Sequence, residues 1–357
     1  MNKNSKIYVA GHRGMVGSAI VRKLKEEGYN NLVFRTSKEL DLRRQKDTEE
    51  FFEKERPEYV FLAAAKVGGI LANSTYVAEF IYDNIMIAAN VINSAYKFGV
   101  KKLLNLGSSC IYPRNCSQPM KEEYLLSGKL EPTNEPYAIA KITAIKLCKY
   151  YNEQYGTNFI SVMPTNLYGP NDNFNLETAH VPAALLRKFH LAKLLKEENF
   201  DSIKKDMKKY PIGFGLDKKI NLEDENSIVQ NLEKIGITKD FVLIWGTGDA
   251  YREFLYVDDL ANACLFLMDR YNFEDIGEFI NIGTGKDVKI KEFAEMIKEI
   301  VGFDGEIRYD ISKPDGTPRK LLDISRIKKF KWQPRISLKE GIKKFYDYYR
   351  NSIDRDL

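Results

Sequence analysis

Two side chains four residues apart, Tyr137 and Lys141, are the clearest candidates for acid–base chemistry in this sequence. On a helix, residues at this spacing share one face. An ammonium group near a phenol favours the phenolate, so we expect Lys141 to lower the pKa of Tyr137 and to permit proton exchange near neutral pH. Ser108, expected at the end of a preceding strand, would hydrogen-bond a substrate oxygen. The Tyr-x-x-x-Lys spacing is common in helices, so Ser108 and an upstream glycine loop strengthen the catalytic interpretation.

Cys110 and His180 are two further candidates for proton transfer. Cys110 follows Ser108 by two residues, where the strand is expected to open into the site, and His180 follows a later strand. Thiol and imidazole groups both titrate close enough to pH 7 for this role. A free cysteine is more commonly a buried structural residue, and that alternative stays open for Cys110. The three histidines are scattered with no carboxylate cluster, so we expect no metal site.

A glycine-rich segment near the N-terminus predicts a phosphate-binding loop. An apolar run at 7–10 leads into Gly-x-x-Gly-x-x-Gly, and a helical pattern follows. Glycine permits a tight turn and close approach of a pyrophosphate, and the following helix presents free N–H groups and a positive dipole end. Strand, loop and helix together favour a dinucleotide over a tight turn without a ligand. The loop residues are Gly11, His12, Arg13, Gly14, Met15, Val16 and Gly17.

Two arginines indicate which dinucleotide to expect. The second predicted strand ends at Arg35, where an NAD enzyme usually carries a carboxylate for the ribose hydroxyls. Arg35 and Arg13 suit the 2′-phosphate of NADP, which a carboxylate would repel. The sequence therefore favours NADP(H) as cofactor. The alternative is that Arg35 is an ordinary surface arginine.

Alternating strands and helices through the first 170 residues predict an α/β fold. The expected strands are 6–10, 31–35, 59–65, 102–106 and 161–164, and the expected helices are 18–27, 49–54, 78–98 and 136–155. This order implies a doubly wound parallel sheet of modified Rossmann type, whose ligands bind beyond the carboxyl ends of the strands. We assign 1–170 mainly to an NADP-binding domain. Residues 171–357 are assigned mainly to a smaller α/β substrate domain interleaved with it.

The segment 191–240 breaks this alternation. It carries ten basic and ten acidic residues between positions 193 and 240, with few aromatic residues. We expect solvated helices around a loop at 211–216. The balanced charge argues against an arm that binds nucleic acid.

The composition limits the class of protein. With 44% hydrophobic residues, 29% charged residues and a formal charge of +5, the chain is typical of a soluble globular protein and gives no case for nucleic-acid binding. No apolar stretch approaches the roughly 20 residues that span a bilayer. The four cysteines include no Cys-x-x-Cys pair, so we expect neither zinc nor a disulfide framework. A reducing cytoplasm is the simpler location.

Six blocks of sequence carry a family resemblance, and together they span nearly the whole chain. The blocks are 11–18, 63–70, 107–113, 131–141, 163–170 and 313–320. They resemble the GDP-fucose synthases, which are extended short-chain dehydrogenases/reductases. Several of the blocks are long, so the resemblance is more specific than a likeness of fold.

The resemblance implies conversion of GDP-4-keto-6-deoxymannose to GDP-fucose, by epimerisation at C3 and C5 followed by reduction of C4 with NADPH. The C4 ketone acidifies the protons on C3 and C5, so one group must remove a proton and another must return it on the opposite face. By resemblance Cys110 is the base and His180 the acid. The resemblance also implies a homodimer with a four-helix interface built from the helices at 78–98 and 136–155.

The resemblance alone implies further site residues. Toward the cofactor these are Asp41, Leu42, Ala64, Leu106, Gly107, Lys141, Pro164, Asn166, Leu167 and His180. Toward the substrate they are Ser109, Cys110, Lys188, Trp245, Arg252 and Asp315. The family often has arginine at the position of Lys188. The segment 191–240 is an insertion between Lys188 and Trp245, next to the expected sugar-nucleotide site, so it bears on which sugar is used.

Three rival functions remain at this stage. A 4,6-dehydratase on the same fold needs a carboxylate acid and base beside the serine, whereas this chain has Ser109-Cys110 there. A reductase or epimerase acting on a related sugar, such as a GDP-keto-heptose, fits the same residues. A non-enzymatic NADP-sensing module has no use for the proton relay formed by Ser108, Tyr137 and Lys141.

Overall fold

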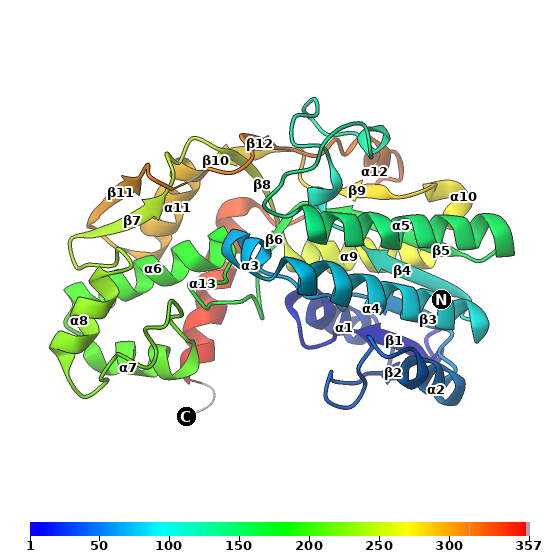
Figure 1. Ribbon diagram of the computed structural model, residues 1–357, viewed down its shortest axis with the longest axis horizontal. Coiled ribbons are helices and arrows are strands. Elements are labelled where there is room, and N and C mark those ends of the chain that lie inside the picture. The colour runs from blue at the N-terminus through cyan, green and yellow to red at the C-terminus, as the bar shows by residue number, and fades with distance from the viewer. Residues whose placement is uncertain (314, 355–357) are drawn as a thin grey trace.

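The computed structural model describes residues 1–313 and 315–354, and the backbone but not the side chain of Ile70. Pro314 in the block 313–320, and the last three residues of the predicted second domain, lie outside this described part. The described elements gather in two lobes joined by a smaller sheet, with the N-terminus in one lobe and the C-terminal helix in the other (Figure 1).

Within the described residues, a six-stranded parallel sheet in the order β2-β1-β3-β4-β5-β9 forms the centre of the first lobe. Its strands are β1 (Ile7–Ala10), β2 (Leu32–Val33), β3 (Tyr59–Leu62), β4 (Lys102–Leu106), β5 (Phe159–Pro164) and β9 (Ile280–Ile282). The strand order reverses between β1 and β3, which is where such sheets bind their ligands. The second strand was predicted over 31–35 but is limited to the two residues that pair with Ile7 and Tyr8.

Helices cover both faces of this sheet, as expected for a doubly wound fold. One face packs on α1 (Met15–Glu26) and α9 (Val257–Arg270), and the other on α2 (Gln45–Glu55), α4 (Val77–Lys97) and α5 (Glu135–Tyr155). The strands are therefore buried on both sides and almost continuously apolar, as in Ile7-Tyr8-Val9-Ala10. Among the described residues no helix is both long enough and apolar enough to cross a bilayer.

The second lobe surrounds a separate apolar core. Its elements are α6 (Val181–Lys196), α7 (Phe200–Lys209), α8 (Glu225–Glu233), β7 (Phe241–Trp245), α11 (Ile290–Val301), β11 (Glu306–Asp310) and α13 (Leu338–Asp354). β7 and β11 form a parallel pair in register from Phe241 opposite Glu306 to Trp245 opposite Asp310. The pairing brings together segments about sixty residues apart in the chain.

The segment 191–240 was predicted to be a solvated helical layer, and that prediction was wrong in its burial. Its helices contribute Ile203, Ile228 and Leu232 to the second core, each with no exposed surface. Asp206 of α7 is also fully buried and forms a 2.7 Å ion pair with the fully buried Arg187 of α6. The charges balance because one face of each helix is polar, while the opposite face packs inward.

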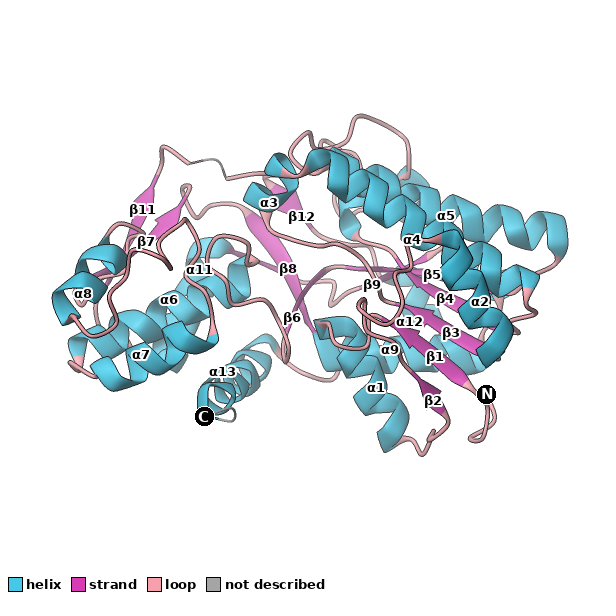
Figure 2. Cartoon of the chain, turned by 60° about the horizontal axis from the view of Figure 1, so that its bottom comes forward, coloured by secondary structure: helices cyan, strands magenta, loops and turns pink. Residues whose placement is uncertain are grey.

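A small sheet connects the lobes (Figure 2). In it β8 (Tyr251–Tyr256) pairs with β10 (Asp287–Lys289), with β12 (Arg319–Lys320) and with β6 (Asn166–Tyr168). β12 follows a long loop from the second lobe, so strands from the middle and from the C-terminal part of the chain meet at β8. The remaining helices are the short α3 (Ile70–Thr75), α10 (Phe273–Ile276) and α12 (Ser325–Lys329).

Candidate active site

The glycine loop after β1 is shaped by the close approach of its own backbone. Gly11 has a φ of +81° and lies against β3, so an added Cβ would come within 2.8 Å of the Ala63 and Ala64 backbone. At Gly17 an added Cβ would lie 2.1 Å from the Gly11 carbonyl oxygen. Helix α1 begins after Gly14 with no side-chain cap, which leaves its first N–H groups for a ligand. The loop therefore fits a dinucleotide pyrophosphate.

The two arginines predicted to select NADP differ in their surroundings. Arg13 is exposed in the loop and has no recorded hydrogen bond or ion pair within the described chain. Arg35 donates to Glu55 at 2.6 Å and to the Phe34 carbonyl at 2.7 Å. Arg13 is thus the freer cation for a 2′-phosphate, whereas Arg35 would share a phosphate with an existing carboxylate partner.

His12 occupies the same corner of the loop. Its ring stacks on Phe34 with centroids 5.0 Å apart, and its Nδ1 is buried with no hydrogen-bond partner in the described structure. Burial and the neighbouring Arg13 lower the pKa of His12, so the ring is neutral at pH 7. An unsatisfied buried ring nitrogen calls for a partner, which a bound cofactor would supply.

The other residues expected at the cofactor follow the carboxyl ends of the strands along one edge of the large sheet. They are Asp41 and Leu42 beyond β2, Ala64 beyond β3, Leu106 and Gly107 at β4, Pro164 at the end of β5, and Asn166 and Leu167 in β6. An added Cβ at Gly107 would meet the Met163 side chain at 2.3 Å. Asp41 is held by Arg43 at 2.8 Å. The parallel sheet places these separate segments at one edge.

The predicted catalytic residues Ser108, Tyr137 and Lys141 come from two elements that meet at this edge. Ser108 lies two residues beyond the end of β4, and Tyr137 and Lys141 lie in the first two turns of α5. The Lys141 ammonium group donates to the Leu106 carbonyl at 2.7 Å and lies 5.7 Å from the centre of the Tyr137 ring. A hydrogen bond involving the Ser108 side chain lowers the pKa of Tyr137. The three side chains are thus brought together.

The expectation that Lys141 lowers the pKa of Tyr137 was wrong for this structure. Burial is the largest influence and raises the pKa of Tyr137 well above its usual value. Burial also lowers the pKa of Lys141 to about 8. Both shifts have one cause, because removing water disfavours the charged form of each group. Tyr137 therefore holds its proton firmly at pH 7, which suits a donor better than a base.

Cys110 and His180 lie near Lys320, a lysine that was not among the predicted site residues. Burial raises the pKa of Cys110, while the Ser108 hydroxyl, Lys320 and Lys141 lower it. Burial and Lys320 lower the pKa of His180. The Lys320 charge thus acts on both groups, so Lys320 lies close to the proposed base and to the proposed acid. Its only signal in the sequence was its position at the end of the block 313–320.

Hydrogen bonds and strand pairing connect three of the residues expected at the substrate, from Trp245 in the second lobe to Lys320 in the small sheet. The hydroxyl and backbone N–H of Thr247, two residues after Trp245, donate to the Asp315 carboxylate at 2.8 and 2.7 Å. Arg252 donates to the Asp315 carbonyl at 3.3 Å, and the register of β8 and β12 places Lys320 beside it. We call Trp245, Asp315, Arg252 and Lys320 the β8–β12 row.

The β8–β12 row places two cations, Arg252 and Lys320, side by side, with the carboxylates of Asp315 and Glu131 near them. Burial lowers the pKa of Arg252 to about 10, with Asp315 and Glu131 opposing the shift. Burial lowers the pKa of Lys320 as well. Two half-buried cations side by side repel each other and favour a bound anion. This chemistry fits a diphosphate.

Lys188 and Ser109 lie apart from that row in different ways. The Lys188 ammonium group donates to the carbonyls of Ile235 at 3.0 Å and Leu243 at 2.9 Å, so it ties the end of the insertion to β7. Burial lowers its pKa to about 8. Ser109 is buried in the short turn that follows Ser108. Among the predicted substrate residues, Lys188 thus has most of its hydrogen-bonding capacity already used.

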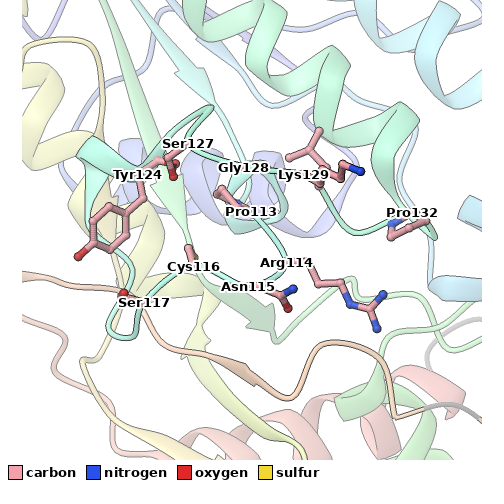
Figure 3. Close-up of a pocket in the computed structure, with 11 residues that line it drawn as sticks. Pro113, Arg114, Asn115, Cys116, Ser117, Tyr124, Ser127, Gly128, Lys129 and Pro132 are labelled. Atoms are coloured by element: carbon pink, nitrogen blue, oxygen red, sulfur yellow. Dashed lines mark hydrogen bonds between the residues drawn. The ribbon is translucent and has the colours of Figure 1, made fainter.

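A separate open cavity of about 700 Å³ lies outside this group of residues (Figure 3). Its lining comes from the segments 113–117 and 124–132, and it contains none of the residues predicted above. Arg114 and Lys129 lie on one side of it, and Tyr124 lies on the other. The candidate active site is therefore not this cavity but the edge of the sheet together with the β8–β12 row.

Comparison with known proteins identifies the family. The NAD dependent epimerase/dehydratase family matches residues 7–206 and 214–283. This chain belongs to that family. GDP-L-fucose synthase 1 of Arabidopsis thaliana is 52% identical over 352 residues, which cover 99% of this chain and 95% of the relative.

Two solved structures extend this assignment within the epimerase/dehydratase family. A GDP-6-OMe-4-keto-L-xylo-heptose reductase from C. jejuni is 44% identical with a TM-score of 0.91, covering 99% of each chain. A GDP-mannoheptose C4 reductase from Campylobacter jejuni with NADP bound is 42% identical with a TM-score of 0.83, covering 98% of this chain and 99% of the other. The relatives thus include proteins named for hexose and for heptose substrates.

Proposed function

We propose that the protein is an NADP(H)-dependent epimerase/reductase that converts GDP-4-keto-6-deoxymannose to GDP-L-fucose. The observation that carries this proposal is the grouping of two proton-transfer sets at one place. Ser108, Tyr137 and Lys141 form one set, and Cys110 and His180, joined through the charge of Lys320, form the other. The 52% identity to a GDP-L-fucose synthase over nearly the full chain supports the substrate.

The chain's groups divide the reaction between them. Cys110 removes a proton next to the ketone, and His180 returns one on the opposite face. Bound NADPH would supply the hydride that reduces C4. Tyr137 would give its proton to the C4 oxygen, which Ser108 would hold. The Lys141 ammonium group lies 5.7 Å from the centre of the Tyr137 ring, and its charge opposes only in part the desolvation of the phenolate left behind. The cations of the β8–β12 row hold the diphosphate.

The division of the reaction makes the proposal testable with two substitutions. Cys110→Ser replaces the thiol with a hydroxyl that barely ionises at neutral pH, so it should abolish deuterium incorporation at C3 and C5 from heavy water. Tyr137→Phe should do the reverse, slowing NADPH oxidation by about 10²–10⁴ while deuterium incorporation persists. The substrate is GDP-4-keto-6-deoxymannose with NADPH, and the product sugars are identified by NMR. Deuterium incorporation by Cys110→Ser at the wild-type rate would make Cys110 structural and the protein a simple C4 reductase.

A second candidate is C4 reduction, with or without epimerisation, of a GDP-keto-heptose. The likeness to the C. jejuni heptose reductase, with its TM-score of 0.91, favours this candidate. Turnover of the GDP-keto-heptose at a higher kcat/KM than GDP-4-keto-6-deoxymannose would establish it. The two candidates share the cofactor, the diphosphate contacts and the proton donor.

We also propose that residues 1–170 mainly bind the cofactor, that residues 171–357 mainly bind the substrate, and that the protein is cytoplasmic.

We propose in addition that the protein is a homodimer. Large apolar side chains that stay exposed concentrate on α4 and α5, the helices expected at the interface. They are Val77, Tyr82, Tyr96, Ile139, Tyr150 and Tyr155. Exposed apolar side chains that gather on two neighbouring helices are typical of a protein contact. Tyr82→Asp, which places a charge there, should shift light scattering from dimer toward monomer.

A further inference from the structure

The insertion sends one aromatic side chain to the end of the β8–β12 row. Phe214 lies in the loop between α7 and α8, and its ring stands 6.4 Å from the ring of Trp245 at an interplanar angle of 61°. Trp245 is the exposed member of this pair, with 46% of its surface accessible, although it is one of the largest apolar residues. Lys313 lies on the ring as well, with its ammonium group 5.5 Å from the centroid.

The Phe214 loop is held in an unusual backbone conformation. Three consecutive residues, Gly213, Phe214 and Gly215, have φ values of +83°, +55° and +66°. Glycine adopts this region freely, but a bulky residue such as phenylalanine does so at a cost. Such a residue persists only where the surrounding structure imposes it, and it often marks a functional position.

Hydrogen bonds donated by the loop backbone to two carboxylates impose this conformation. Glu177 accepts from the Phe214 N–H at 2.7 Å, and Asp217 accepts from the N–H groups of Ile212 and Gly213 at 2.7 and 3.0 Å. Glu177 stands three residues before His180. The loop is thus fixed on one side to the segment that carries His180, and on the other it reaches Trp245.

The order of residues along the β8–β12 row indicates which part of a substrate reaches the aromatic pair Phe214 and Trp245. The proton-transfer groups Cys110 and His180 lie close to Lys320, so we expect the reacting end of a substrate at this end of the row. Arg252 lies beside Lys320, and Asp315 joins Arg252 to the turn after Trp245. With the sugar near Lys320 and the diphosphate at the two cations, the nucleoside would lie at the Trp245 end of the row. An open indole ring is a surface on which a base can stack.

We propose that Phe214 is a specificity-determining residue, which closes one side of the Trp245 surface and so selects a purine base there. This inference rests on the proposed function, since it takes the substrate to be a GDP-linked sugar. Phe214 meets the Trp245 ring edge to face, an arrangement that fixes the indole plane, and 46% of the Trp245 surface stays accessible. A purine presents a larger aromatic surface to the two rings than a pyrimidine does.

Nucleotide binding to the full-length protein tests this assignment. Titration calorimetry with GDP, UDP and NADPH would be carried out on the wild type and on Phe214→Ala. The substitution should weaken GDP binding about three- to tenfold, the size expected for one lost aromatic contact, and leave UDP and NADPH affinities nearly unchanged. Equal loss for GDP and UDP, or no loss at all, would overturn the assignment.

Three further measurements keep the test decisive. Phe200→Ala is the matched control, because Phe200 begins α7 in the same insertion and packs against the second core as Phe214 does, whereas the ring contact with Trp245 is made by Phe214. Phe214→Tyr should restore the GDP preference, and Phe214→Leu replaces Phe214→Ala if the latter does not fold. A wild type that binds neither GDP nor UDP would instead refute the proposed function. Deleting 199–231 is a poorer test, because it removes Asp206 and leaves the Arg187 charge buried alone.

Discussion

The phosphate loop and the β8–β12 row both fit phosphate groups, but they are assembled in different ways. The loop is one run of seven residues from Gly11 to Gly17, and its shape comes from glycines and the start of α1. The row takes Trp245, Arg252, Asp315 and Lys320 from three strands and a loop, and Phe214 reaches it from the insertion. Local backbone chemistry forms the first site, and tertiary packing forms the second.

The difference predicts that damage to the loop stays confined to the cofactor. In Gly17→Ala the new Cβ would lie 2.1 Å from the Gly11 carbonyl oxygen, so the turn cannot keep its shape. We expect this variant to lose measurable NADPH binding and to retain the wild-type affinity for GDP. Calorimetry with both ligands measures this, and circular dichroism checks that the fold persists. A parallel loss of GDP binding would contradict the separation of the two sites.

Substitutions in the second core, on which the β8–β12 row rests, should instead lower the stability of the protein. Asp206 pairs with Arg187 inside the second core and accepts from the hydroxyl of Tyr349. Asp206→Asn keeps the size but leaves a buried guanidinium without its counter-charge, which should lower the free energy of unfolding by about 3–5 kcal/mol. Denaturant titration measures the change. The exposed Asp201 of the same helix supplies the control, since Asp201→Asn should change stability by under about 1 kcal/mol.

The preference for NADPH should depend more on Arg13 than on Arg35. Arg13 is free of recorded partners in the described chain, whereas Arg35 already pairs with Glu55. A lost charge-assisted hydrogen bond of about 1.5–3 kcal/mol corresponds to a roughly ten- to hundredfold loss of NADPH affinity for Arg13→Ala. Arg35→Ala should show a smaller loss, and NADH binding should change little in either variant. Equal kcat/KM for NADPH and NADH in the wild type would remove the basis for this prediction.

The smallest expected effect is a shift in pH dependence caused by Lys320. If the productive form needs the Cys110 thiolate and the His180 imidazolium, deuterium incorporation is flat between the two pKa values. It falls below the pKa of His180, where thiolate is lost, and above the pKa of Cys110, where imidazolium is lost. Lys320 lowers both pKa values, so Lys320→Met should move both limbs to higher pH. A profile that keeps its position would place Lys320 outside the proton-transfer group.

The sequence by itself determined the features that depend on nearby residues. The glycine spacing fixed the phosphate loop, because only glycine tolerates the approach of Gly17 to Gly11. The apolar periodicity predicted the helices α4 and α5 and the strands β1 and β4 to within a residue or two. The spacing of Tyr137 and Lys141 placed both on one helix, because residues four apart share a face.

Only the tertiary structure decided how charges and distant segments meet. Burial raised the pKa of Tyr137 where proximity to Lys141 alone predicted the opposite, because desolvation depends on every atom packed around the phenol. The balanced charge of 191–240 suggested a solvated layer, yet its apolar face and Asp206 lie in the second core. Lys320 and Phe214 stand far from Cys110 and Trp245 in the chain. Strand pairing and a strained loop bring them close, and neither leaves a periodic signal in the sequence.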